Sequence, residues 1–138
     1  MPLIPSEPKS RSKVVVIDDE APILDIISTT LRAHGYGVTT FTEPLKALAW
    51  LSGNDWKVDL IITDIIMPGQ DGLALARTIR AKGGPVAILL ISARISEEGL
   101  WGEENQNLPF LPKPFTTAEL IEAVESTMAR FPRQTPRP

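Results

Sequence analysis

The sequence predicts an α/β domain whose five mainly parallel strands are covered by helices on both faces. Short β-branched or apolar runs alternate with segments of helical periodicity, and these runs lack the apolar–polar alternation of a half-exposed sheet. The length of 138 residues suits a single domain. Right-handed crossovers between successive parallel strands would place helices on both sides.

The first expected strand is the β-branched run 14–17, and a helix follows it. Pro22 falls where the first helical turn tolerates proline, and Gly35 is placed to close the helix. Apolar residues recur every four positions between them: Ile23, Ile27 and Leu31. We assign His34 to the end of this helix, where a cation is favoured, and not to a metal site.

The second strand is expected at 38–41, and residues 42–44 begin the second helix. That helix carries three apolar residues in its first two turns: Leu45, Leu48 and Ala49. The third strand is expected at 59–63. Three residues at helical spacing mark the helix after it: Leu73, Ala76 and Ile79.

The run 86–91 is the clearest strand, and a short fifth strand is expected at 109–111. Residues 95–108 fit no clean period, so the sequence leaves open whether the fourth helix is short or irregular. Thr116 and Glu119 have the spacing of a capping box at the start of the last helix. Its apolar face carries four residues: Leu120, Ile121, Val124 and Met128.

Composition sets the domain limits and excludes several function classes. Six of the thirteen prolines lie near the ends, so we expect flexible extensions at 1–12 and 132–138 around a folded domain at 13–131. The absence of cysteine excludes disulfides and thiolate chemistry. A net charge of −3 argues against direct nucleic-acid binding. No apolar run is long enough for membrane insertion, and we expect a cytoplasmic protein.

Polar residues that suit one chemical task gather where the expected strands end. Asp18 and Asp19 follow the first strand, Asp64 the third and Ser92 the fourth, while Lys113 follows the fifth. The carboxyl ends of parallel strands share one rim, where ligands bind in open α/β sheets. Clustered carboxylates suit Mg²⁺, and a metal-bound carboxylate can act as a nucleophile toward phosphorus.

Each residue alone also has an ordinary structural explanation. Asp18, Asp19 and Glu20 could cap the first helix. Asp64 could open a turn, Ser92 could cap a helix, and Lys113 could be a solvated surface residue. Their coincidence at the ends of different strands on one rim favours a site.

These residues stand in motifs that resemble the receiver domain of bacterial response regulators, over about residues 13–131. The motifs are Val-Val-Val-Ile-Asp-Asp-Glu at 14–20, Ile-Ile-Thr-Asp-Ile-Ile-Met-Pro-Gly-Gln-Asp-Gly at 61–72, Leu-Ile-Ser-Ala at 90–93 and Phe-Leu-Pro-Lys-Pro-Phe at 110–115. The resemblance implies a flavodoxin-like (βα)5 sandwich of three layers with strand order 2-1-3-4-5.

The resemblance also implies roles for single residues. Asp64 would be the phosphoryl acceptor, and Ser92 and Lys113 would contact the phosphoryl group. Phe110 would be an aromatic switch that moves with Ser92. The metal ligands for Mg²⁺ would be Asp18 (through water), Asp19, Asp64 and the backbone carbonyl of Ile66. The Lys113–Pro114 bond is expected to be cis, as only bonds to proline readily are.

The sequence departs from the family pattern at three places. Ile66 offers no polar side chain two residues beyond Asp64, so we expect slow loss of the phosphoryl group. Residues 105–109 replace the usual small-residue element before the fifth strand. Phe110 has no phenol with which to contact a partner.

The resemblance implies a receiver that accepts its phosphoryl group from a histidine kinase or a phosphotransfer protein. It would catalyse only its own phosphorylation and dephosphorylation, and would signal through a downstream protein partner at the 94–131 face. Acidic residues outnumber basic ones on that stretch, which favours a partner with a basic or mixed patch, unless these acids are ordinary solvated helix faces. Two alternatives stay open: a Mg²⁺-dependent phosphotransferase or phosphatase of a small substrate, and a phosphorylation-independent binding module.

Overall fold

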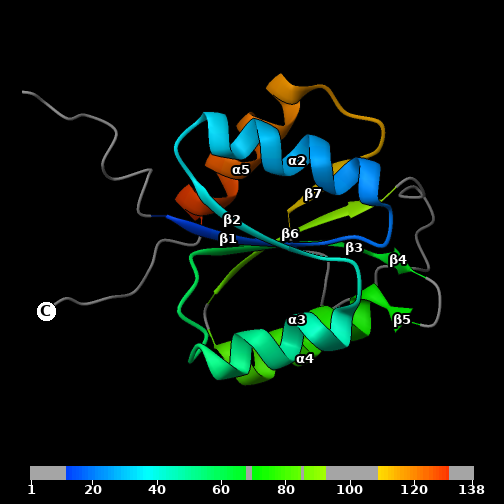
Figure 1. Ribbon diagram of the computed structural model, residues 1–138, viewed down its shortest axis with the longest axis vertical. Helices are drawn as coiled ribbons and strands as arrows, with labels where there is room; N and C mark the ends of the chain where they lie inside the picture. Colours follow the sequence, from blue (N-terminus) through cyan, green and yellow to red (C-terminus); the bar gives the residue numbers. More distant parts are fainter. Residues whose placement is uncertain (1–11, 68–69, 85, 93–108, 131–138) are drawn as a thin grey trace, which may run out of the picture.

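The computed structural model describes residues 12–67, 70–84, 86–92 and 109–130. A five-stranded parallel sheet forms its middle layer, in the order β2-β1-β3-β6-β7 (Figure 1). Counting these five strands along the chain, the order is 2-1-3-4-5, which confirms the predicted flavodoxin-like topology. No described helix has the length and apolar character needed to cross a membrane.

Every described helix follows a strand along the chain. The strands of the main sheet are β1 (Lys13–Ile17), β2 (Gly37–Phe41), β3 (Leu60–Asp64), β6 (Ala87–Ser92) and β7 (Phe110–Pro112). The described helices are α2 (Ala21–Ala33), α3 (Pro44–Gly53), α4 (Gly72–Gly83) and α5 (Thr117–Arg130). The region of the predicted fourth helix, 95–108, lies outside the described residues.

The sheet separates two apolar cores, because successive side chains of each strand point to opposite faces. On one face, Val14 of β1 belongs to a buried cluster with Ile27 of α2 and Leu120 of α5. On the other face, Val15 belongs to a cluster with Leu51 of α3 and Ile79 of α4. Figure 1 shows α2 and α5 on one side of the sheet and α3 and α4 on the other.

Three strands lie one residue further along the chain than predicted. β3 ends with Asp64 and β6 with Ser92, whereas the sequence placed both residues just beyond their strands. β7 likewise begins at Phe110 and not at 109. A short antiparallel pair, β4 (Ile66–Met67) and β5 (Gln70–Asp71), was not predicted; it directly follows β3.

Only some of the apolar residues of α3 form its buried face. Ala47 and Leu51 are buried, while Leu45 is 67% exposed and Ala49 is exposed. The helix is apolar on more than one side, so its sequence alone did not select the face that packs on the sheet.

The end of the first helix forms as the sequence predicts. After α2, the N–H groups of Gly35 and Tyr36 donate to the carbonyls of Arg32 and Leu31, with Gly35 at a φ of 93°. These paired bonds define a Schellman motif, which needs a left-handed residue. His34 occupies the C-cap, and its Nδ1 lies 3.0 Å from the carbonyl oxygen of Thr30.

The connection from α3 to β3 contains two successive left-handed residues. Asp55 and Trp56 have φ angles of 58° and 57°, a backbone conformation that residues other than glycine rarely adopt. The ring of Trp56 lies against the backbone of Gly83 at the end of α4, where a Cβ atom would come within 2.6 Å of Trp56 Cε3. This contact joins the end of α4 to the connection that follows α3, on the same face of the sheet.

Candidate functional site

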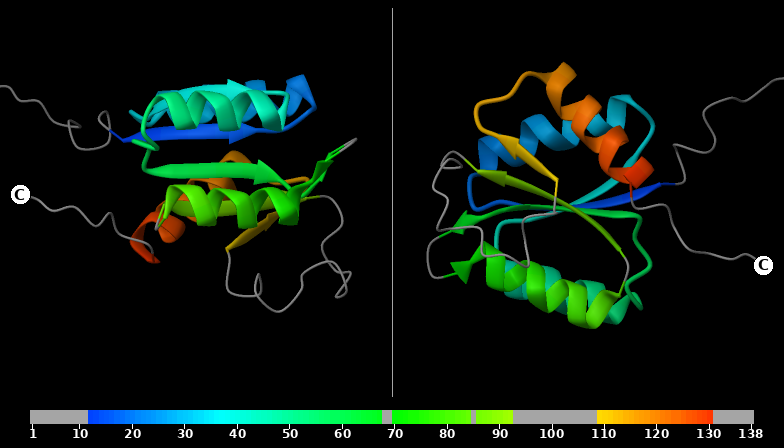
Figure 2. Two further views of the ribbon diagram at one scale, coloured as in Figure 1. Left: turned by 90° about the horizontal axis from the view of Figure 1, so that it is seen from below. Right: turned by 180° about the vertical axis from the view of Figure 1, so that it is seen from behind.

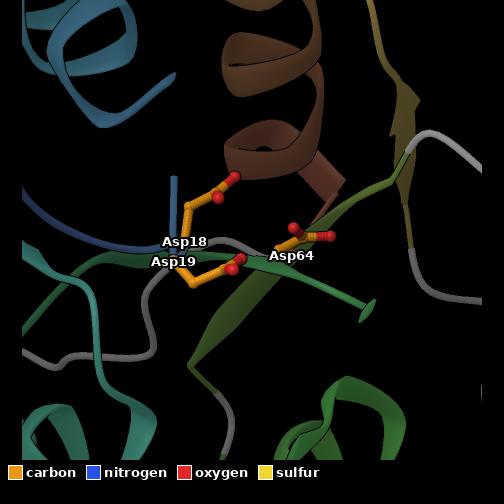
Figure 3. A group of neighbouring side chains, drawn as sticks. All are labelled: Asp18, Asp19 and Asp64. Atoms are coloured by element: carbon orange, nitrogen blue, oxygen red, sulfur yellow. The ribbon is translucent and has the colours of Figure 1, made fainter. Parts of the chain in front are cut away.

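Three aspartates meet at the carboxyl ends of β1 and β3. Ile17 pairs with Thr63 in the parallel ladder, so both strands continue into an aspartate, Asp18 and Asp64. Asp19 comes next on the loop toward α2. Each of the three side chains has a carboxylate oxygen within 4.8 Å of one on each of the others, and Figure 3 shows the three side chains near one another.

The three carboxylates differ in exposure. Asp18 is fully buried and Asp64 is 4% exposed, whereas Asp19 is exposed. Buried carboxylates that lie this close repel one another unless a cation compensates them. The site therefore needs positive charge to keep all three ionised.

Lys113 supplies one positive charge. Its Nζ lies 2.9 Å from Asp18 Oδ2, donates to Asp64 Oδ2 at 3.0 Å and lies 3.3 Å from Glu20 Oε1. The backbone holds the lysine in place, since its N–H donates to the carbonyl of Ser92 at 2.8 Å. The Lys113–Pro114 peptide bond is cis, as expected.

Burial and charge act in opposite directions on these groups. Burial raises the pKa of Asp18, and the neighbouring ammonium of Lys113 only partly opposes this. Burial by itself would lower the pKa of Lys113, but its contacts with Asp18 and Asp64 outweigh the desolvation and raise it. The lysine therefore stays charged while the site is formed.

The donor set fits a hard divalent cation. Although Asp18 Oδ2 is within ion-pair distance of Lys113, this buried oxygen accepts no hydrogen bond in good geometry from any described residue. It remains available to a water or a cation. Together with Asp19 and Asp64 it provides the carboxylate oxygens that Mg²⁺ prefers.

The remaining predicted residues lie on β4, β6 and β7. Asp64 pairs with Ile91 in the ladder, so the buried Ser92 lies one residue beyond that pair at the end of β6. Ile66 begins β4, two residues after Asp64. Phe110 begins β7 and packs, partly buried, against the core beneath α3 and α4.

The capping explanation for the first acidic run fails in the structure. Glu20 is the N-cap of α2 but makes no side-chain cap bond, and its N–H donates to Asp18 Oδ1 at 2.9 Å. Asp18 thus fixes the turn into the helix while its other oxygen faces Lys113. The sequence did not identify Glu20 as a member of the site; its position directly after two aspartates was the only signal.

The chain is similar to a large group of known proteins. A family model described as the response regulator receiver domain matches residues 14–125. Chemotaxis protein CheY4 of Vibrio cholerae is 28% identical, covers 84% of this chain and 98% of its own, and superposes with a TM-score of 0.76.

Two further solved structures show the same similarity. A response regulator receiver protein from Sinorhizobium medicae is 31% identical, covers 86% of this chain and 94% of its own, and has a TM-score of 0.74. The receiver domain of the Francisella response regulator 1452 is 30% identical over 87% and 98% of the two chains, with a TM-score of 0.75.

Proposed function

Because this chain belongs to the family of response regulator receiver domains, we propose that it accepts a phosphoryl group on Asp64 from a histidine kinase or a phosphotransfer protein. One observation carries the proposal. A single ammonium, that of Lys113, bridges the buried carboxylates of Asp18 and Asp64 at the carboxyl ends of the sheet.

In the transfer, a carboxylate oxygen of Asp64 attacks the phosphorus of the donor's phosphohistidine. A P–O bond to Asp64 forms while the P–N bond to the histidine breaks, which leaves an acyl phosphate and a free histidine side chain. Lys113 holds Asp64 in place and balances the negative charge of the incoming phosphoryl oxygens. Mg²⁺, held by Asp18 through water, Asp19, Asp64 and the Ile66 carbonyl, would neutralise phosphoryl charge when bound.

Ser92 and Phe110 couple Asp64 to the output surface. The hydroxyl of Ser92 donates a hydrogen bond to the new phosphoryl group. Phe110 changes its packing as Ser92 moves. The stretch 94–131 then presents a changed surface to a downstream protein partner. The chain catalyses only its own phosphorylation and dephosphorylation.

Intact mass spectrometry tests phosphorylation directly. We expect the chain to gain the mass of one phosphoryl group after incubation with Mg²⁺ and acetyl phosphate. Asp64→Asn should abolish the gain, because the amide is not a nucleophile. Asp25→Asn, at an exposed position on α2, is the matched control and should still gain it. No gain in the unaltered chain would point to a phosphorylation-independent binding module.

Thermal unfolding with Mg²⁺ tests the cation site separately. At a concentration tenfold above its Kd, Mg²⁺ should stabilise the native state by about 1.4 kcal/mol. Asp19→Asn should remove most of this gain, because it deletes one carboxylate ligand from an exposed position. Asp25→Asn should keep it. An equal response of both variants would place the cation elsewhere.

A further inference from the structure

A hollow of about 420 Å³ lies at the far end of the sheet from the three aspartates, between β1, β2 and the end of α3. Lys13 and Gly37, which begin β1 and β2, mark one side of it. Val15, Thr39 and Trp50 line its interior. Its size lies within the usual range of ligand pockets, about 300–1,000 Å³.

The lining of this hollow is positively charged. Lys13 and Lys57 both contribute to it, and none of its lining residues is acidic. Neither lysine forms an ion pair with any residue in the described ranges. The carboxylate of the nearby Asp59 accepts a hydrogen bond from the backbone N–H of Lys13 at 2.7 Å, which holds this carboxylate at the main chain.

The hollow opens beside an edge strand. Gly37 donates to Ser12 and Phe41 accepts from Asp18, so the odd-numbered residues of β2 turn their peptide groups toward β1. Alternation turns the peptide groups of Val38 and Thr40 away from the sheet, since β2 is its outermost strand. Figure 2 shows β2 at this edge, with α3 beside it.

The edge carries little of the usual protection against added strands. β2 has neither proline nor a charged side chain. The Arg32 side chain covers part of it, because its Nη2 donates to the carbonyl of Val38 at 3.0 Å. This exposed arginine can move away, because this is the only hydrogen bond or ion pair of its side chain among the described residues.

Gly37 lines the hollow and contributes no side chain to it. A Cβ atom at this position would meet nothing nearer than the Ser12 carbonyl oxygen, at 3.7 Å. The backbone therefore does not require glycine here for lack of room, and the missing side chain leaves space beside Lys13. A larger side chain would enter the hollow without straining the strand.

We propose that the β2 edge and this hollow bind an extended segment of a partner protein that carries an acidic side chain. The segment pairs with the outward peptide groups of Val38 and Thr40 and displaces Arg32. One of its side chains enters the hollow beside Trp50. Its carboxylate lies near Lys13 and Lys57. This surface is separate from Asp64 and acts in both phosphorylation states.

Selection from a random heptapeptide library displayed on phage tests this proposal on the full chain. We expect enriched peptides to carry an acidic residue within an alternating β-branched pattern. Their affinity, measured by fluorescence anisotropy, should fall about tenfold in the Lys13→Glu/Lys57→Glu variant, which reverses two charges. Gly37→Leu should weaken binding similarly, by filling the hollow.

Lys46→Glu is the matched control, because Lys46 is exposed on α3 outside the hollow, and affinity should stay within about twofold. Melting temperature and phosphorylation on Asp64 should be unchanged in every variant, which separates this surface from the proposed function. Enrichment of no peptide, or equal binding to the double lysine variant, would overturn the proposal. Tighter binding by a synthetic peptide of residues 1–11 would also overturn it, and would assign the surface to the chain's own N-terminal segment.

Discussion

Tyr36 is the only tyrosine of the chain and lies buried between the end of α2 and the start of β2. Burial raises the pKa of its phenol above the ordinary value of 10.0, and the negative charge of Glu125 raises it further. The folded state therefore holds this proton more tightly than the unfolded state does. Stability must depend on pH wherever the two states differ in bound protons.

The sign of this dependence is fixed by the raised pKa. Below about pH 10 the phenol is protonated in both states, and its contribution is constant. Above that pH the unfolded chain releases the proton first, so the free energy of unfolding falls. We expect Tyr36→Phe to lose less stability than the unaltered chain above about pH 10, in urea unfolding measured across the alkaline range. Phenolate absorbance follows the deprotonation of the same residue. If the free energies of unfolding of the two proteins changed in parallel with pH, the expectation would be refuted.

Ile66 sets a second expectation at the scale of single residues. It lies two positions after Asp64, where a polar side chain could orient a water toward the phosphoryl group. Ile66→Asn should shorten the lifetime of the phosphoryl group by about tenfold, because its amide can hydrogen-bond the attacking water. Mass spectrometry over time measures the decay. Ile26→Asn, on the exposed side of α2, should leave the lifetime unchanged.

At the scale of elements, α5 begins with a complete capping box. The Glu119 N–H donates to Thr116 Oγ1 at 3.0 Å, and the Thr116 N–H donates to Glu119 Oε1 at 2.9 Å. Two donors that the helix cannot satisfy internally are thereby paired. Since the box begins three residues after Lys113, it also fixes the chain next to the acidic site.

Removing the cap should cost stability and little else. We expect Thr116→Ala to lower the free energy of unfolding by about 1 kcal/mol, because the Glu119 N–H loses its acceptor. Thr117→Ala alters the exposed neighbouring residue, which makes no cap bond, and should change stability by less than about 0.5 kcal/mol. Urea unfolding compares the two. An equal effect would mean that the box contributes nothing.

Two glycines that end helices should respond oppositely to alanine. Gly53 ends α3 with no atom within 4 Å of an added Cβ, so Gly53→Ala should be neutral or stabilise by up to about 1 kcal/mol. Gly83 ends α4 against Trp56. Gly83→Ala should destabilise by about 1–3 kcal/mol, because the ring must shift to admit the methyl group. Thermal unfolding measures both variants. Equal changes in their melting temperatures would contradict the contact between Gly83 and Trp56.

The strands were predictable from their apolar runs, but their ends were not. Asp64 and Ser92 look like stop signals in sequence, yet the backbone ladder continues through them, since Asp64 pairs with Ile91 and Ser92 with Pro112. Peptide groups pair regardless of side-chain polarity. The acidic site was predictable for a related reason: parallel strands bring their ends together, whatever lies between them in sequence.

What sequence could not predict depended on choices made in three dimensions. The sequence could not predict the buried face of α3, because Leu45 and Leu51 are equally apolar and only packing against the sheet buries one of them. The contact of Glu20 with Lys113 joins residues 93 positions apart and depends on the conformations of both side chains. The left-handed pair Asp55 and Trp56 carries no glycine to mark it.

At the scale of the whole molecule, two regions of opposite charge lie at opposite ends of the sheet. The carboxyl ends of its strands hold the aspartates, and the amino ends of β1 and β2 border the hollow with its two lysines. On β1, Val16 and Ile17 lie between the residues that line the hollow and Asp18, and the strand runs about 17 Å from Lys13 to Asp18. A partner bound at the hollow would therefore leave the phosphorylation site accessible.

The start of β1 and the end of α5 both lie at the amino ends of the strands (Figure 2). Anything joined to either end of the domain, whether a dye, a surface or another protein module, attaches on the side away from Asp64. For a biosensor that measures phosphorylation, this geometry favours attaching the reporter to either end of the domain. For a biosensor that measures binding at the hollow, a label on a single introduced cysteine is better, because the chain has no other cysteine.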